Sequence, residues 1–587
     1  MEEFGLERPV DHLGASTEAD RVATTEADRV ATTVTRLADA YVAEFLTRFP
    51  DRAELEGLSV DRHDRLSDNS LKAVREWQTV EDGWAKAIEP LDAALLHGRP
   101  EWITYGFLNE AIESSRRARV CHYELWPVNH LSGWQAHLAQ LASVQPVGTD
   151  VARAEALARW AGLPRYLETE IRNLREGLRL GYTTPKRPVQ LVIEQLDALL
   201  ASPVEQWPFY GPAERDGSAA FQAELKRLLT ERIAPAIVRY RTYLRDEYLA
   251  NARDTIAITG NPDGEDCYQA AFRAHTTIER PAAETFALGG KRVEQNLAEA
   301  LEIGRNSLGT DDLQSLVTRM NADPANRFES RDSLLEFAKD AVARSRNRMP
   351  EFFAHLPQAD ISIEPYPAFL ERDVVDDSYF AAADDGSRPA RYLIALYHFA
   401  GATRSNAEIT AFHEAYPGHH LEVGLARERT AAHPITRLVS NAGFAEGWAR
   451  YAEALAEEMG LYISDYAHAN RRLWPGRGMV VDPGIHLFGW SREQAAAFMA
   501  ESGRVTPEEA DAMVDRIAVW PGQLPAYDTG ALEFFALRRQ AEEALGESFD
   551  IREFHDVVLG SGAVTLPMLR EQVQRWLESS HGDPSAH

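Results

Sequence analysis

Residues 406–429 read NAEITAFHEAYPGHHLEVGLARER, and this stretch decides most about the chain. Three histidines fall within eight residues, at His413, His419 and His420, and Glu414 directly follows the first. A His-Glu pair on a helix is typical of zinc sites in which two histidines one turn apart hold the metal and the glutamate is the general base. The position one turn after His413 is Pro417, so the second histidine must come from further along.

The Pro417-Gly418 step distinguishes the two later histidines. Proline inside a helix removes a hydrogen bond and clashes with the preceding turn, so we expect a bulge or break here. If both residues loop out, His419 takes the place of the missing ligand. In an unbroken helix, His420 would lie about 10.5 Å along the axis from His413. Both nitrogens must approach one zinc to about 2.0–2.1 Å, so we favour His419 and keep His420 as the alternative, beside the ligands or the substrate.

A third ligand is expected on a nearby helix, because a catalytic zinc commonly takes three protein ligands and leaves one position for water. Residues 441–460, NAGFAEGWARYAEALAEEMG, offer Glu446 and Glu453, which lie seven apart and so on one face. Gly443 and Gly447 would let this helix approach the metal helix, so Glu446 is preferred and Glu453 is the alternative. A surface ion pair between Glu446 and Arg450 is the simpler interpretation.

These motifs resemble a known family. HEAYPGHHLE is similar to the HExxPGHH signature of the domain-of-unknown-function 885 family, bacterial proteins placed among zinc metallopeptidases of the gluzincin type. Further segments resemble family blocks in the same order, at residues 260–289, 444–455, 480–495, 520–546 and 554–569. The resemblance covers roughly residues 150 to 575. It implies a mainly α, two-lobed helical body with a deep central cleft, Zn²⁺ as cofactor, and hydrolysis of peptides or related amides.

Glu414 is the expected catalytic base, taking a proton from a zinc-activated water and passing it to the leaving nitrogen. Tyr527 and His486 are candidates for stabilising the oxyanion, because both lie in C-terminal blocks that resemble the family. A packing tyrosine and a core histidine are the simpler interpretations. Arg538 or Arg539 could anchor a substrate carboxylate, but a solvated helix face with neighbouring glutamates is favoured.

Composition and the N-terminal sequence indicate which binding partners and which cellular location to expect. The 587 residues contain 62 Lys and Arg against 91 Asp and Glu, a formal charge of -29, which disfavours nucleic acid and anionic membrane surfaces. The start, MEEFGLERPVDHLG, lacks the basic and apolar regions of a signal peptide, so a cytoplasmic location is expected. The only cysteines are Cys121 and Cys267, and two free, buried thiols are favoured over a bridge. The sequence predicts no oligomeric state.

Four segments are expected along the chain. Residues 1–33 form an N-terminal arm with the octapeptide TEADRVAT in tandem, residues 34–255 a helical lobe, 256–575 the catalytic zinc lobe, and 576–587 a flexible tail. Helical periodicity of apolar residues supports the lobes, and the turn residues of AITGNPDGED separate them. A small β patch, ISIEPYPAF at 361–369 and RYLIALYHF at 391–399, precedes the metal motif.

Three functions fit these residues. The leading hypothesis is a zinc hydrolase acting on short peptides or small amides. The alternative is a dedicated metal-dependent amide hydrolase, or a related enzyme, acting on one small metabolite of a biosynthetic pathway. A non-catalytic metal-binding protein is the hypothesis of another class, and Glu414 weighs against it, because a structural site needs no general base. A divalent metal other than zinc fits the same ligands.

Overall fold

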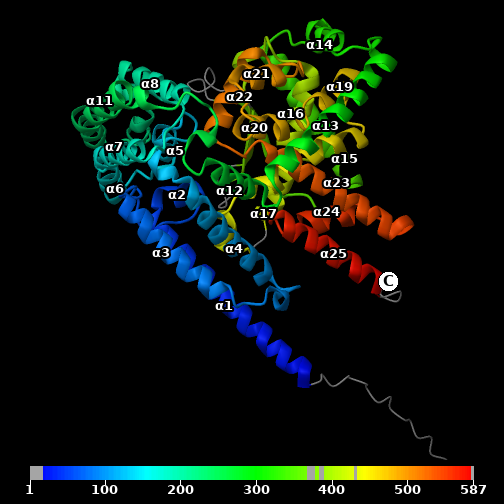
Figure 1. Cartoon of the computed structure of the whole chain (residues 1–587), viewed down its shortest axis with the longest axis horizontal. Helices are drawn as coiled ribbons and strands as arrows, with labels where there is room; N and C mark the ends of the chain where they lie inside the picture. Colours follow the sequence, from blue (N-terminus) through cyan, green and yellow to red (C-terminus); the bar gives the residue numbers. More distant parts are fainter. Residues whose placement is uncertain (1–17, 367–376, 383–388, 429–431, 583–587) are drawn as a thin grey trace, which may run out of the picture.

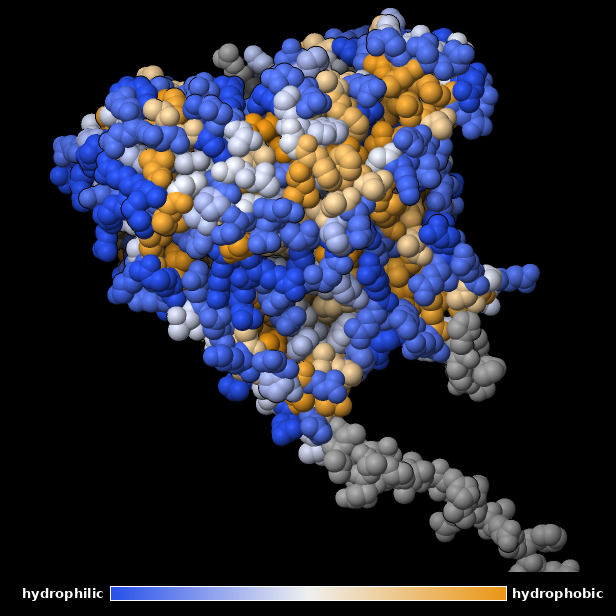
Figure 2. All heavy atoms as spheres, viewed as in Figure 1, coloured by the Kyte–Doolittle hydropathy of each residue, from blue (hydrophilic) through white to orange (hydrophobic). Residues whose placement is uncertain are grey.

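Helices dominate the computed structural model, which describes residues 18–366, 377–382, 389–428 and 432–582. Figure 1 shows helices from the first half of the chain on the left and those of the second half on the right, with α1 extending away at the lower end. The prediction of a mainly α fold is confirmed. In the described part of the chain, no helix is long and apolar enough to cross a membrane. Hydrophilic residues cover most of the face seen in Figure 2.

The group on the left encloses its own core, built from residues between 128 and 252. Trp160, Leu174 and Ile237 are fully buried there. Apolar residues three and four apart on these helices supply its inner faces, as the sequence pattern predicted. The helices are α5 (Trp134–Val144), α6 (Asp150–Ala161), α7 (Leu163–Leu180), α8 (Lys186–Ala201), α9 (Gly211–Glu214), α10 (Ala219–Leu228) and α11 (Ala234–Tyr243).

A larger core joins the beginning of the chain to its second half. Tyr41 and Phe107 lie in one buried cluster with Phe412 and Trp448. Residues 34–255 therefore do not share a single core, because their first helices pack with the segment that carries the metal motif. Those first helices are α1 (Glu18–Arg48), α2 (Pro50–Leu55), α3 (Leu71–Ile88) and α4 (Pro100–Ala118).

The second half of the chain supplies the remaining helices and most of the larger core. They are α12 (Gly264–Thr276), α13 (Ala282–Ile303), α14 (Leu313–Ala322), α15 (Arg331–Arg348), α16 (Arg404–Glu414), α17 (His419–Arg427), α18 (Ala442–Glu458), α19 (Asp465–Leu473), α20 (Arg477–His486), α21 (Arg492–Ala500), α22 (Pro507–Val519), α23 (Pro525–Leu545), α24 (Ile551–Leu559) and α25 (Leu566–Gly582).

Two of the predicted segment limits fall inside helices. α1 is continuous from Glu18 to Arg48, so the limit between residues 33 and 34 lies within it, and the second octapeptide is part of this helix. α25 continues to Gly582, past the limit between residues 575 and 576. The limit near residue 255 lies between helices, directly after the left-hand core ends at Ala252.

The expected β patch supplies two strands of a three-stranded sheet in the described residues, with strand order β1-β3-β2. Residues 367–369 of the expected patch lie outside the described residues, and residues 396–398 form a 3-10 turn instead of a strand. β1 (Ile361–Pro365) pairs parallel with β3 (Ala390–Ile394), and β2 (Ser378–Phe380) pairs antiparallel with β3. On β3, the buried Tyr392 donates its hydroxyl to Asp377 Oδ2 at 2.7 Å. The chain leaves β3 and enters α16, so the sheet lies immediately before the metal motif.

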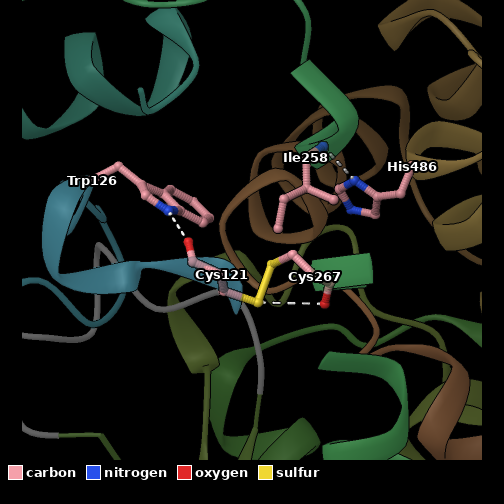
Figure 3. Close-up of a disulfide and its surroundings, with 5 residues drawn as sticks. All are labelled: Cys121, Trp126, Ile258, Cys267 and His486. Atoms are coloured by element: carbon pink, nitrogen blue, oxygen red, sulfur yellow. Dashed lines mark hydrogen bonds between the residues drawn. A yellow bond between two sulfur atoms is a disulfide. The ribbon is translucent and has the colours of Figure 1, made fainter. Parts of the chain in front are cut away.

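Cys121 and Cys267 form a disulfide, so the expectation of two free thiols is wrong. The bridge joins the segment after α4 to α12, over a separation of 146 residues, and both cysteines are 2% exposed (Figure 3). Their Cα atoms lie 4.7 Å apart, within the range that a disulfide spans. Disulfides are typical of oxidising compartments, which weighs against the cytoplasmic location expected from the sequence.

We predict that reduction of this bridge destabilises the protein by about 2–5 kcal/mol, because the bridge closes a long loop in the unfolded chain. Denaturant unfolding with and without dithiothreitol measures the difference. Alkylation with iodoacetamide followed by mass spectrometry provides the control: denatured, unreduced protein should take up no label, and reduced protein should take up two. Labelling of both cysteines before reduction would contradict the bridge.

Candidate metal centre

The metal motif is divided between two helices. α16 ends at Glu414 and α17 begins at His419, so the helix breaks at the Pro-Gly step, as the sequence predicted. The Tyr416-Pro417 peptide bond is cis. Side chains from neighbouring helices hold the break: Trp448 Nε1 donates to the Pro417 carbonyl at 2.9 Å, and Ser345 Oγ donates to the Tyr416 carbonyl at 2.8 Å.

Glycine is required at position 418. A Cβ atom there would lie 1.9 Å from the His413 carbonyl oxygen and 2.5 Å from that of Phe412. Both atoms belong to the backbone of α16, so neither can move without distorting the helix. Close approach of Gly418 to the end of α16 is thus what returns the chain toward His413.

Three ligand atoms converge beside this break. His413 Nε2 and His419 Nε2 each lie 3.5 Å from Glu446 Oε2, and ligand atoms of all three residues lie within 4.8 Å of one another. Four ligands at 2.0–2.1 Å around a tetrahedral zinc are about 3.3–3.4 Å apart, so the spacing suits this ion. Glu446 Oε2 is buried and has no hydrogen-bond partner among the described residues. The donor set and this unsatisfied oxygen both fit a bound cation.

The three side chains are not completely enclosed. The exposed fractions of the three side chains are 12% for His413, 14% for His419 and 21% for Glu446. A structural zinc site normally closes around four protein ligands. In the described residues no other group of three or more His, Cys, Asp or Glu side chains has this spacing.

Glu453 lies behind the ligands rather than among them. It accepts a hydrogen bond from His413 Nδ1 at 2.9 Å, and Arg450 Nη1 donates to both of its oxygens, at 2.7 and 2.9 Å. A carboxylate on the far nitrogen fixes the tautomer and orientation of a metal-binding histidine. Arg450 is buried here, so the surface ion pair with Glu446 considered from the sequence is not formed.

The charged groups of the centre alter one another's pKa values. Burial alone lowers the pKa of His413, but its contacts with Glu446 and Glu453 outweigh burial and raise it to about 9. Burial raises the pKa of Glu446, yet the two histidines hold it far below its usual range. Burial raises the pKa of Glu414 to about 7, against the effect of both histidines. A carboxyl group with a pKa near 7 can both accept and release a proton at neutral pH.

His420 lies away from the three ligands. It is fully buried, its ring lies 4.7 Å from that of Tyr416, and its Nδ1 is 3.4 Å from the Tyr379 hydroxyl. Burial lowers its pKa to about 4. Of the two neighbouring histidines, the structure brings His419 to the centre and packs His420 against tyrosines.

Tyr527 lies beside the centre. Its ring is 6.3 Å from that of His413 with an angle of 21° between the planes, and the Arg450 guanidinium lies 5.6 Å from its centroid. Burial raises the pKa of Tyr527 to about 12, so its hydroxyl keeps its proton at neutral pH. Arg516 donates to the hydroxyl oxygen at 3.2 Å.

His486 is a core residue. The Ile258 N–H donates to its Nδ1 at 3.0 Å (Figure 3). Its Nε2 donates to the Ile517 carbonyl at 3.1 Å. Burial lowers its pKa to about 3. Both ring nitrogens are used by the backbone, so the structure gives His486 no donor for an oxyanion and matches the simpler interpretation.

The candidate carboxylate anchors lie elsewhere. Arg538 forms a bidentate pair with Glu458 at 2.8 and 2.9 Å and a third contact with Glu542 at 2.9 Å, and Arg539 is exposed. Arg539 therefore lies on the solvated helix face favoured from the sequence, whereas Arg538 is 16% exposed and its guanidinium is occupied by glutamates and by the Tyr451 hydroxyl.

The glycines of α18 serve a different contact from the one expected. A Cβ atom on Gly447 would lie 2.5 Å from the Gly530 Cα, and one on Gly530 would lie 1.7 Å from the Gly443 carbonyl oxygen. They let α18 approach α23, which carries Tyr527, rather than the metal helix. The same helix, α18, presents Glu446 to the two histidines.

The sequence did not indicate the roles of two arginines around the centre, Arg450 and Arg516. The spacing of Arg450 and Glu453 allowed an ion pair on one helix face, but nothing in the sequence indicated its burial. Arg516 lies eleven residues before Tyr527 on another helix, and no motif links the two.

This fold and site define a class of protein: mainly helical, with a His-His-Glu group whose side chains are partly exposed. The family model described as "Bacterial protein of unknown function (DUF885)" matches residues 50–573, so the chain belongs to this family. No curated protein matches the sequence.

Two solved structures share the fold. The "putative lipoprotein from Colwellia psychrerythraea" is 22% identical, with a TM-score of 0.84, over 94% of this chain and 99% of that one. A "putative lipoprotein of unknown function from Shewanella oneidensis" is 17% identical, with a TM-score of 0.76, over 92% and 99%. At these identities the likeness shows the fold alone.

We predict that Gly418→Ala destabilises the protein by about 1–3 kcal/mol, because the new Cβ overlaps the α16 backbone. Gly290→Ala is the matched control: Gly290 lies inside α13, and no atom comes within 4 Å of the position that its Cβ would take, so alanine there should be neutral or stabilising. Denaturant unfolding compares the two variants. Equal stability of both would contradict the role assigned to Gly418.

We also predict that His486 makes stability depend on pH. Its pKa is about 3 in the folded protein and about 6.5 in an unfolded chain, so only the unfolded chain takes up this proton between those values. Stability should fall as pH drops below 6.5, by up to about 1.4 kcal/mol per pH unit from this group. His486→Gln should show a shallower slope between pH 6 and 4 and the same slope above pH 7. An unchanged slope in the variant would count against this assignment.

Proposed function

We propose that this protein is a zinc-dependent hydrolase that cleaves the amide bond of short peptides or small amides. One observation carries the proposal: His413, His419 and Glu446 converge with the spacing of zinc ligands, with Glu414 at the end of the same helix as His413. Bound there, zinc would polarise a carbonyl and lower the pKa of a water molecule.

The protein's own side chains then provide the proton transfers. Glu414 accepts the proton of the attacking water and returns it to the leaving nitrogen, as a general base beside a metal-bound water does. Glu453 keeps the proton of His413 on Nδ1, which leaves Nε2 directed at Glu446 and His419. The Tyr527 hydroxyl supplies a donor for the oxygen that becomes negative.

A set of three protein ligands with partly exposed side chains favours catalysis over a purely structural metal site. A general base beside three partly exposed ligands has no purpose in a purely structural site. The deep cleft, the choice between a mixture of peptides and one metabolite, and the cleavage position remain predictions. A library of dipeptides, oligopeptides and acyl amides separates the substrates, since a dedicated amide hydrolase would leave nearly all of the peptides intact.

We predict that Glu414→Gln lowers kcat by about 10²–10⁴-fold while the zinc content stays near that of the wild type. The amide keeps the size of the carboxylate but cannot take up the proton. Metal analysis and hydrolysis of the library measure both properties in the same preparations. Glu408→Gln is the control, because Glu408 is also a buried carboxylate of α16 but pairs with Arg344 at 2.6 Å.

The ligands are tested in the same assays. His419→Ala should lose zinc and His420→Ala should retain it. Wild-type protein that is purified without zinc, does not take it up and leaves the whole library intact would rule out the hydrolase. Zinc binding without hydrolysis would leave the non-catalytic metal-binding protein as the answer.

A further inference from the structure

The hydroxyl of Tyr527 is contacted by Arg516 of α22, which also contacts the turn that follows this helix. Arg516 Nη2 donates to the hydroxyl oxygen at 3.2 Å and to Gln523 Oε1 at 2.7 Å. A guanidinium can only donate, so the phenolic oxygen accepts in this contact. Arg516 and Gln523 both lower the pKa of Tyr527, against the effect of burial.

The turn between α22 and α23 is itself fixed. The Gly522 N–H donates to Asp482 Oδ1 at 3.0 Å, and the same oxygen accepts the Tyr268 hydroxyl at 2.6 Å. Asp482 and Tyr268 are fully buried, so this anchor is shielded from water. The Arg516 guanidinium also lies 5.7 Å from the centroid of Trp520 in this turn. Arg516, which donates to Tyr527, is thus held by contacts with a turn that is itself anchored in the core.

Tyr527 itself lies beside the metal centre. Its ring is parallel to that of His413 to within 21°, and the Arg450 guanidinium lies near the ring. Tyr527 lies in the first turn of α23, and the close contact of Gly530 with α18 fixes this helix against the helix that carries Glu446. With the ring held against His413 and Arg450, the rotation of the hydroxyl sets the direction of its proton.

We propose that Arg516 is a positioning residue: by occupying the Tyr527 hydroxyl oxygen as donor, it directs the phenolic proton toward the carbonyl oxygen of a substrate bound at His413, His419 and Glu446. The inference rests on the proposed function. No bond to Arg516 is made or broken. It acts through Tyr527, which donates one hydrogen bond to the oxygen as it gains negative charge and keeps its proton throughout.

The test is a double-mutant cycle on zinc-loaded protein, with the best-cleaved member of the library as substrate. Tyr527→Phe should lower kcat about 10²–10³-fold with little change in KM, since the lost donor acts on the transition state. Arg516→Ala should lower kcat about 10–100-fold, and Arg516→Lys should restore part of the loss. In the Tyr527→Phe background, Arg516→Ala should not lower kcat further, because Arg516 acts on the reaction only through the hydroxyl that this variant lacks.

Two additional measurements separate positioning from damage to the fold. A phosphinic dipeptide, whose tetrahedral oxygens resemble the transition state, should bind more weakly to Arg516→Ala and Tyr527→Phe, with unchanged zinc content. Arg492→Ala is the matched control. Arg492 of α21 pairs with Asp511 and Asp515 of α22, the helix that carries Arg516, at 3.2 and 2.5 Å. This substitution should leave kcat and phosphinate binding unchanged.

The outcomes distinguish this inference from the proposed function. If Arg516→Ala lowers kcat equally with and without the Tyr527 hydroxyl, or leaves kcat and phosphinate affinity unchanged, the positioning role is wrong while the hydrolase stands. If the wild type neither cleaves the library nor binds the phosphinic dipeptide, the hydrolase fails and this inference fails with it.

Discussion

The reversal of the chain between Glu414 and His419 is the constraint on which the centre depends. Without it, the second histidine would leave along the axis of α16 and could not share an ion with His413. The reversal needs a residue without a side chain at Gly418, and it needs partners for the carbonyl groups that the broken helix frees. Trp448 supplies one of those partners from α18, so the helix that holds the break also carries Glu446.

α18 contacts both the histidines and α23, because its faces carry different residues. One face presents Glu446 and Glu453 to the histidines, and the small residues Gly443 and Gly447 lie against α23. The absence of side chains at that contact lets α23, which carries Tyr527, approach the helix of the proposed zinc ligand Glu446. A larger residue at Gly447 would push α18 and α23 apart, because its Cβ atom would meet Gly530 and Ala531. This contact links packing away from the histidines to the geometry of the site.

Much of this could be predicted from the sequence, because the relevant signals are local. Proline and glycine mark the break, helical periodicity marks the helices, and the seven-residue spacing of Glu446 and Glu453 places both on one face. What could not be predicted depends on contacts between distant segments. Cys121 meets Cys267 across 146 residues, the N-terminal helices share a core with Phe412, and His486 has both nitrogens satisfied by backbone from two other segments.

The balance of charge explains why the centre suits a divalent cation. Glu414, Glu446 and Glu453 bring three carboxylates close together at partly or fully buried positions, and Arg450 neutralises the charge of Glu453. The remaining negative field raises the pKa of His413 to about 9 although burial opposes it, so a proton is drawn to the point where the ligand atoms converge. A divalent ion satisfies the same field with twice the charge and frees both histidines to act as neutral ligands. Glu453 and Arg450 are therefore as much a part of the proposed zinc site as the residues that would touch the metal.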